Sequence, residues 1–187
     1  MTIRSKVDST YLHSHPDKIP LKHSDGKVSS NGQQVTGYSF EDRNNDWVIY
    51  PPLNSTLNYT TEKIQIQDGE IVRLKHIKTD KFLLTHDVAS PLTKHLQEVA
   101  CFEINNENDT YYNHSLWRLK VTKGDSKLFS NANYFRLEHV LTKCNLNNFQ
   151  KALPSWGYSQ LEINSGKLQS PSTEWMIEKA DTPSGYF

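Results

Sequence analysis

A tryptophan followed by any residue and then an apolar residue occurs three times in this chain, and this repetition constrains the fold most. The copies are Trp47-Val48-Ile49, Trp117-Arg118-Leu119 and Trp175-Met176-Ile177. Two other elements recur in pairs, Arg73-Leu74-Lys75-His76 with Arg136-Leu137-Glu138-His139, and Tyr11-Leu12-His13-Ser14-His15 with Phe82-Leu83-Leu84-Thr85-His86. Recurrence at similar offsets indicates a structure built from repeated units. The elements mark three units, at about residues 6–50, 69–120 and 133–179.

The segments inside these units predict strands. Apolar and polar residues alternate over short runs such as residues 64–67 and 71–76, and turn signals such as Asp25-Gly26 and Asp68-Gly69 separate the runs. Only residues 92–99 also allow a short helical turn. Three strand-rich units in one small chain predict an all-β, pseudo-threefold architecture with equivalent hairpins and a shared core. We expect the three tryptophans to pack in that core rather than to serve as exposed stacking platforms.

Length and charge set broad limits on organisation and partners. The 187 residues contain no evident linker, which predicts a single domain over residues 1–187. The 21 basic and 21 acidic side chains balance, so no long-range field favours nucleic acid or anionic lipid. No apolar run approaches the roughly 18 residues of a membrane helix, which predicts no direct membrane insertion of this chain.

The candidate binding residues gather in the first unit, between aromatic and β-branched neighbours. They are side chains that donate and accept hydrogen bonds, as hydroxyl-rich ligands and peptide backbones require: His13, His15, Gln33, Gln34, Asp42, Asn44 and Asn45. Strand alternation places His13 and His15 on one face, and lets at most one glutamine of the pair face a common ligand. The alternatives are one histidine hydrogen-bonded in the core with the other at the surface, and a turn over residues 42–46 that caps itself by Asx hydrogen bonds.

Metal and catalytic chemistry have little support in the sequence. No third metal ligand lies near the two histidines, so no metal site is predicted. Ser14 lies between them, but strand neighbours point to opposite faces and no Gly-X-Ser-X-Gly motif is present. No carboxylate pair or glycine-rich phosphate loop is recognisable. We therefore predict no catalytic residue and no cofactor.

Cysteines and glycosylation signals bear on the compartment. Cys101 and Cys144 allow one disulfide at most, and we expect two free thiols, with Cys101 in the core. Asn-X-Ser/Thr triplets, which are glycan acceptors only in a secretory lumen, occur at Asn54, Asn58, Asn108 and Asn113. Their grouping in residues 51–61 and 105–115 predicts two exposed loops.

These residues together resemble the MIR domain, the β-trefoil module shared by protein O-mannosyltransferases and the inositol trisphosphate and ryanodine receptors. The resemblance lies in residues 12–15, 32–36, 42–47 and 83–92, and covers nearly the whole chain. These segments are most similar to the mannosyltransferase branch, in particular the fungal Pmt4 type and animal protein O-mannosyltransferase 1. The resemblance implies a β-trefoil of three pseudo-symmetric MIR repeats.

The resemblance also implies a function. The parent would be a multispanning membrane protein that transfers mannose from dolichyl phosphate mannose to Ser or Thr, with this domain as a loop in the endoplasmic reticulum lumen. The catalytic carboxylates of the family lie elsewhere, so this chain would hold a Ser/Thr-rich acceptor or an O-mannosylated peptide without transferring sugar. The first-unit set would form one pocket, with weaker equivalents around His76, His86 and His139. The third unit departs from the pattern at residues 144–147.

Its other expected partner is the remainder of the enzyme, as a dimer. The alternative interpretation is a structural or interaction module for dimerisation or chaperone contacts that binds no sugar.

Overall fold

A computed structural model describes residues 1–23, 25–55, 66–124 and 133–179. In these residues the chain is all-β, as predicted, with twelve strands in one sheet and no α-helix. The strands are β1 (Thr2–Ser5), β2 (Tyr11–Lys18), β3 (Gln33–Tyr38), β4 (Trp47–Tyr50), β5 (Ile71–His76), β6 (Lys81–Ala89), β7 (Gln97–Phe102), β8 (Trp117–Lys123), β9 (Tyr134–His139), β10 (Asn145–Ala152), β11 (Leu161–Gly166) and β12 (Trp175–Lys179).

Helical geometry is limited to single 3-10 turns in the described residues. They are η1 (Arg43–Asn45), η2 (Asn113–Ser115), η3 (Ser155–Gly157) and η4 (Pro171–Thr173). No helix forms over residues 92–99: residues 94–95 make a single turn and β7 begins at Gln97. The four central residues of that strand are buried, and its pairing with β6 outweighs the weak local helical pattern.

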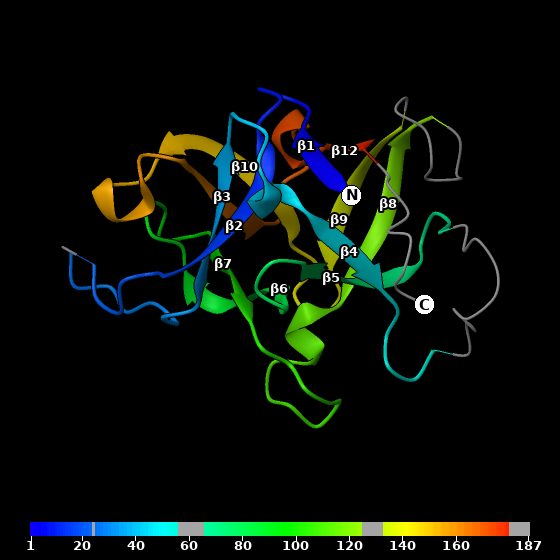
Figure 1. Cartoon of the computed structure of the whole chain (residues 1–187), viewed down its shortest axis with the longest axis horizontal. Helices are drawn as coiled ribbons and strands as arrows, with labels where there is room; N and C mark the ends of the chain where they lie inside the picture. The colour runs from blue at the N-terminus through cyan, green and yellow to red at the C-terminus, as the bar shows by residue number, and fades with distance from the viewer. Residues whose placement is uncertain (24, 56–65, 125–132, 180–187) are drawn as a thin grey trace.

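The sheet closes on itself through pairings that join distant parts of the chain. Its strand order runs β10-β11-β3-β2-β1-β12-β9-β8-β5-β6-β7, and β9 also pairs with β10. Figure 1 shows β1 beside β12, so the first and last strands are neighbours. Closure of this kind leaves few unpaired strand edges.

Three hairpins, β2–β3, β6–β7 and β10–β11, also pair with one another. The contacts are Gln33 with Cys101, Glu98 with Asn164, and Leu161 with Gly37, so each hairpin touches the other two. The turn that leads into each hairpin contains one non-glycine residue of left-handed conformation, namely Ser9 (φ 60°), Asp80 (φ 58°) and Lys143 (φ 60°). Such residues are uncommon, so their recurrence shows that the same turn is built three times.

The three repeated tryptophans are core residues, as predicted. Trp47, Trp117 and Trp175 are each fully buried. Their indole N–H groups donate to the carbonyl oxygens of Leu12 (2.8 Å), Leu83 (3.1 Å) and Leu146 (3.1 Å). Each tryptophan thus fills the core and ties its strand to the hairpin of the same unit, which satisfies the indole donor that burial would otherwise leave unpaired.

Candidate functional site

His13 is held in the first unit by Asn45. The Nδ1–H group of His13 donates to Asn45 Oδ1 (2.7 Å), and Asn45 Nδ2 donates to the carbonyl oxygen of Phe40 (3.0 Å). Both residues are buried, and burial lowers the pKa of His13, so its imidazole is neutral at neutral pH. Asp42 accepts the backbone N–H of Asn44 (2.6 Å) as the cap of η1, which is the Asx turn considered as an alternative.

His15 presents an unused ring nitrogen. Its Nδ1 lies 3.1 Å from Asp17 Oδ2, which also accepts the hydroxyl of Tyr158 (3.1 Å), and the rings of His15 and Tyr158 are in edge contact. Burial lowers the pKa of His15, so the neutral ring carries its proton on Nδ1, facing the carboxylate. Nε2 is buried, has no partner among the described residues, and is therefore an acceptor.

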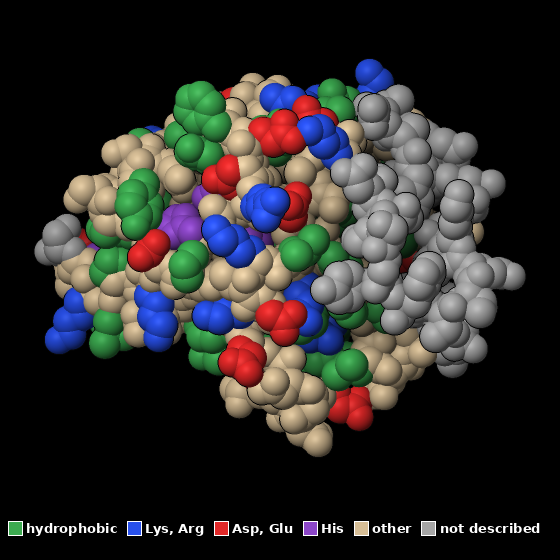
Figure 2. All heavy atoms as spheres, viewed as in Figure 1, with side chains coloured by type: hydrophobic (Ala, Val, Ile, Leu, Met, Phe, Trp, Pro, Cys, Tyr) green, Lys and Arg blue, Asp and Glu red, His purple; other side chains and the backbone are tan. Residues whose placement is uncertain are grey.

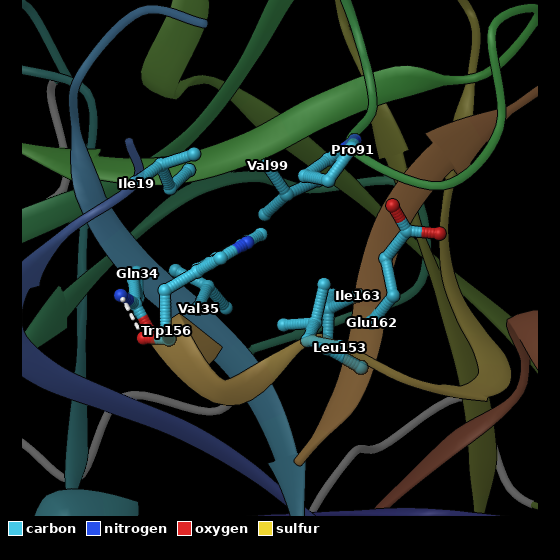
Figure 3. Close-up of a pocket in the computed structure, with 9 residues that line it drawn as sticks. All are labelled: Ile19, Gln34, Val35, Pro91, Val99, Leu153, Trp156, Glu162 and Ile163. Carbon is cyan, nitrogen blue, oxygen red and sulfur yellow. Dashed lines mark hydrogen bonds between the residues drawn. The ribbon is translucent and has the colours of Figure 1, made fainter. Parts of the chain in front are cut away.

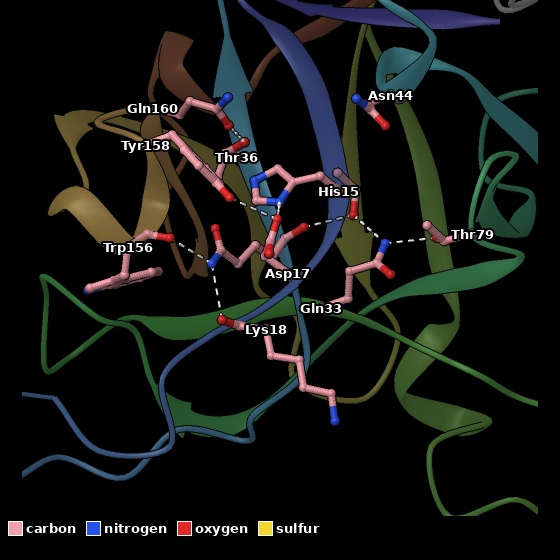
Figure 4. A network of polar contacts seen from close by, with 12 residues as sticks. His15, Asp17, Lys18, Gln33, Thr36, Asn44, Thr79, Trp156, Tyr158 and Gln160 are labelled. Carbon is pink, nitrogen blue, oxygen red and sulfur yellow. Dashed lines mark hydrogen bonds and ion pairs between the residues drawn. The ribbon is translucent and has the colours of Figure 1, made fainter.

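The two glutamines are fixed by their amide nitrogens. Gln34 Nε2 donates to the carbonyl oxygens of Lys18 (3.1 Å) and Trp156 (2.9 Å), whereas Gln33 Nε2 donates to Ser14 (2.8 Å) and Thr79 (2.8 Å) (Figure 4). Their Oε1 atoms, and Oδ1 of Asn44, are buried without a partner in the described part of the chain. Together with His15 Nε2, four acceptors of the predicted set are therefore unused, and such groups call for hydroxyl or N–H donors.

The corresponding position of the second unit is closed. His86 follows Leu83 as His15 follows Leu12, but its Nε2 lies 3.3 Å from Glu98 Oε1, which also accepts from Ser30. Strand pairing sets Glu98 where the first unit has Gln34, because the next residues, Val99 and Val35, face Thr85 and Ser14. The fully buried carboxylate of Glu98 is thus the partner of the His86 ring nitrogen.

The third unit lacks the histidine. Phe149 stands at the place of His15, and Asn147 at the place of His13. The side-chain amide of Asn147 donates to Asn164 Oδ1 (2.8 Å), and Asn164 donates to Glu162 (3.1 Å). These polar groups satisfy one another, so they leave less for a ligand than the first unit does.

His76 and His139 are structural. Each is fully buried, with Nδ1 2.8 Å from the hydroxyl of Thr79 or Thr142 and Nε2 3.1 Å from the carbonyl oxygen of Asn44 or His114. Burial lowers both pKa values to about 4. Because both ring nitrogens are bonded inside the domain, neither histidine has a group free for a ligand.

Several neighbours of the site come from the third unit and were not expected from the sequence. The pairing of β11 with β3 places Gln160 and Tyr158 beside the first unit, and Thr36 shares a hydrogen bond with Gln160 (2.5 Å). Tyr158 and Phe40 are among the most exposed large apolar side chains, at 59% and 69%. Figure 2 shows histidine reaching the surface near β2 and β3, among acidic and hydrophobic side chains.

A small cavity lies beside Gln34. It is lined by Gln34, Trp156 and mostly apolar side chains, and it has a volume of about 10 Å³ (Figure 3). That space is close to the minimum for one water molecule. This cavity is therefore too small for a sugar or a peptide side chain.

Other predicted features fall as follows in the described residues. Both cysteines are free, and burial raises the pKa of Cys101 to about 12. Asn54, Asn108 and Asn113 are exposed, and Asn58 lies outside the described residues. No group of three or more potential metal ligands lies together, and no helix in these ranges is long and apolar enough to cross a membrane.

The fold places the chain in the class of closed all-β domains, and sequence comparison narrows that class. Residues 10–171 match the family described as MIR domain. The chain therefore belongs to the MIR domain family.

Its relatives are parts of larger proteins. The chain is 34% identical over 188 residues to dolichyl-phosphate-mannose–protein mannosyltransferase 4 of Schizosaccharomyces pombe, covering 95% of this chain and 24% of the relative. It is 38% identical over 175 residues to human protein O-mannosyl-transferase 1, covering 90% and 23%. In structure it matches the Saccharomyces cerevisiae protein O-mannosyltransferase Pmt1-Pmt2 complex bound to the sugar donor, with a TM-score of 0.82, 26% identity, and coverage of 97% and 25%. The chain thus spans about a quarter of these relatives.

Proposed function

We propose that this chain is a non-catalytic binding domain of a protein O-mannosyltransferase, and that its first unit holds a Ser/Thr-rich acceptor or an O-mannosylated peptide. The observation that carries the proposal is the pair of unused acceptors His15 Nε2 and Gln34 Oε1, which strand alternation places on one face of the β2–β3 hairpin. Sugar hydroxyls, Ser and Thr hydroxyls and backbone N–H groups supply the donors that such a set lacks. The exposed ring of Tyr158 adds an apolar surface beside them.

The fold proposal is a β-trefoil of three MIR repeats, formed by β1–β4, β5–β8 and β9–β12. It is supported by the three tryptophan-to-leucine hydrogen bonds and by the three left-handed turn residues. The mutual pairing of the three hairpins agrees with a threefold cap. In this arrangement the His13 to His15 site occurs once, since each repeat fills the equivalent position differently.

The proposed setting is the endoplasmic reticulum lumen, as a loop domain of a multispanning enzyme. Relatives at 34% and 38% identity carry mannosyltransferase names, and this chain aligns with about a quarter of each. Exposed Asn54, Asn108 and Asn113 agree with a compartment where N-glycans are added. In the parent enzyme this domain would keep the polypeptide near an active site supplied by other segments.

A peptide titration tests the proposed site. His15→Ala should weaken binding of an O-mannosylated Ser/Thr-rich peptide by about tenfold, as expected for the loss of one well-placed hydrogen bond and a ring contact. The matched control is His86→Ala, whose ring nitrogen is occupied by Glu98. Equal affinity of the unsubstituted protein and the His15→Ala variant would refute the site.

The second candidate function is an interaction module. It is favoured by the match to a chain of a two-component complex, the S. cerevisiae Pmt1-Pmt2 assembly. By this interpretation, exposed apolar side chains such as Phe40 contact another subunit. Sedimentation of the domain alone, with Phe40→Ser as the variant, separates the two: self-association that Phe40→Ser abolishes favours the module.

A further inference from the structure

A second recess lies away from the histidine site, between the second and third units. It has a volume of about 310 Å³, at the lower end of the range for small-molecule sites. It forms where β6 ends, β7 begins, β10 begins and β11 ends, and is lined by Asp87, Val88, Ala89, Lys94, His95, Leu96, Gln97, Cys144, Ser165, Gly166 and Lys167. We refer to these residues as the 2/3 cleft.

The floor of the 2/3 cleft has unsatisfied polar groups. Gln97 and Ser165 are direct partners in the β7–β11 pairing. Gln97 Oε1 and Ser165 Oγ are both buried and have no hydrogen-bond partner among the described residues, and Ser165 is fully buried. Burial without a partner is costly for such groups, and it is tolerated where a ligand or water completes the bonds.

The rim of the 2/3 cleft carries two unpaired cations. Lys94 and Lys167 are exposed and form no ion pair within the described part of the chain, although seven pairs between Lys or Arg and a carboxylate are present there. His95 adds further donor capacity at the rim, and Asp87 supplies a single carboxylate. Cationic donors above a floor of neutral hydroxyl and amide groups suit a ligand that combines an anionic group with hydroxyls.

We propose that the 2/3 cleft binds a monosaccharide that carries an anionic group, a sugar phosphate or a sugar acid. Lys94 and Lys167 contact the anion, and the ligand hydroxyls bond to Gln97 Oε1 and Ser165 Oγ. This site is separate from the first-unit site, with which it shares no residue, and it does not depend on the proposed function.

Amide NMR of the isotope-labelled domain tests this proposal with mannose 6-phosphate and glucuronate as probes. Saturable shifts should occur at the amides of Gln97, Ser165 and Gly166 with at least one probe. Mannose and inorganic phosphate serve as the matched partial ligands, and each should bind at least about tenfold more weakly because it lacks one set of charge-assisted or neutral hydrogen bonds. Tighter binding of mannose 6-phosphate identifies the phosphate as the preferred anion, and tighter binding of glucuronate identifies the carboxylate.

Substitution at the rim provides the second measurement. Lys94→Ala combined with Lys167→Ala should raise the Kd by about tenfold or more and reduce its dependence on salt. Lys151→Ala removes an exposed lysine outside the cleft and should leave the Kd unchanged. The proposal is overturned by an absence of shifts with both probes, by shifts confined to the first unit, or by inorganic phosphate binding as tightly as mannose 6-phosphate.

Discussion

His86 Nε2 lies 3.3 Å from Glu98 Oε1, and this contact closes in the second unit the position that stays open at His15 in the first. Glu98 stands in the second unit where the first unit has Gln34. The amide of Gln34 is turned to two carbonyl oxygens, so it leaves His15 Nε2 without a partner among the described residues. The difference between the two units makes a direct test possible.

The first prediction is that Glu98→Gln opens a second site. Removing the carboxylate frees the ring nitrogen of His86 and gives the second unit the amide of the first, so the binding stoichiometry for an O-mannosylated peptide should rise from about one to about two. Glu162→Gln is the matched control, because Phe149 stands at the histidine position of that unit. Calorimetric titration gives the stoichiometry, and a value that stays at one for Glu98→Gln contradicts the prediction.

The second prediction concerns pH and stability. The folded pKa values of His76 and His139 are about 4, below the ordinary value of 6.5, so the unfolded chain binds more protons between these limits. The contribution of these two histidines to the unfolding free energy is complete above pH 6.5, falls as the pH drops toward 4, and is then constant. At pH 5 the unfolding free energy should be lower than at pH 7 by about 2 kcal/mol for each histidine.

Urea unfolding of His76→Gln at pH 7 and pH 5 measures this effect. The difference in unfolding free energy between the two pH values should shrink by about 2 kcal/mol relative to the unsubstituted protein. His95→Gln alters an exposed histidine and is the control. An unchanged difference in the His76→Gln variant would show that His76 does not resist protonation in the fold.

The third prediction concerns the repeated indole bond. Trp47→Phe keeps an aromatic ring but removes the buried N–H donor to the carbonyl oxygen of Leu12 and part of the core volume, which should lower the unfolding free energy by about 2 kcal/mol or more. Trp156→Phe is the comparison, since that partly exposed indole makes no hydrogen bond in the described residues, and its cost should stay below about 1 kcal/mol. Similar losses in both variants would argue against a special role for the indole bond.

The fourth prediction concerns modification. Asn108 is exposed in a loop of bends and turns, so expression through a secretory lumen should add a glycan there. Asn108→Gln should then remove the mass of one N-glycan from the intact protein, while the neighbouring Asn106→Gln, which is in no acceptor triplet, should remove none. Mass spectrometry before and after glycosidase treatment decides between these outcomes.

Much of the fold could be predicted from local sequence. The spacing of Trp47, Trp117 and Trp175 correctly indicates three core tryptophans, and short alternating runs correctly indicate strands. A strand, β1 (Thr2–Ser5), lies before residue 6, and the sequence pattern did not indicate it because Thr2-Ile3-Arg4-Ser5 lacks the histidine present in residues 73–76 and 136–139. Pairings such as Leu161 with Gly37 could not be predicted, since they join residues that no local pattern relates.

Of the candidate site, only the residues contributed by the first unit could be predicted from the sequence. His13, His15, Gln33 and Gln34 stand together in the sequence, whereas Tyr158 and Gln160 reach the site through the pairing of β11 with β3. The sequence also carries a signal for the two internal histidines. A threonine follows His76 and His139 at the third position, and in both cases its hydroxyl bonds to the ring.

The antiparallel pairing of β1 with β12 also determines how the domain responds to mechanical load. Thr2 and Lys179 are direct partners, so a force that draws these two residues apart acts at one end of the ladder. Each hydrogen bond then carries the load in turn, because the strands separate by peeling rather than by sliding past each other. The β1–β12 pairing should therefore separate at low force, while the core around the three tryptophans remains intact until β1 has been removed.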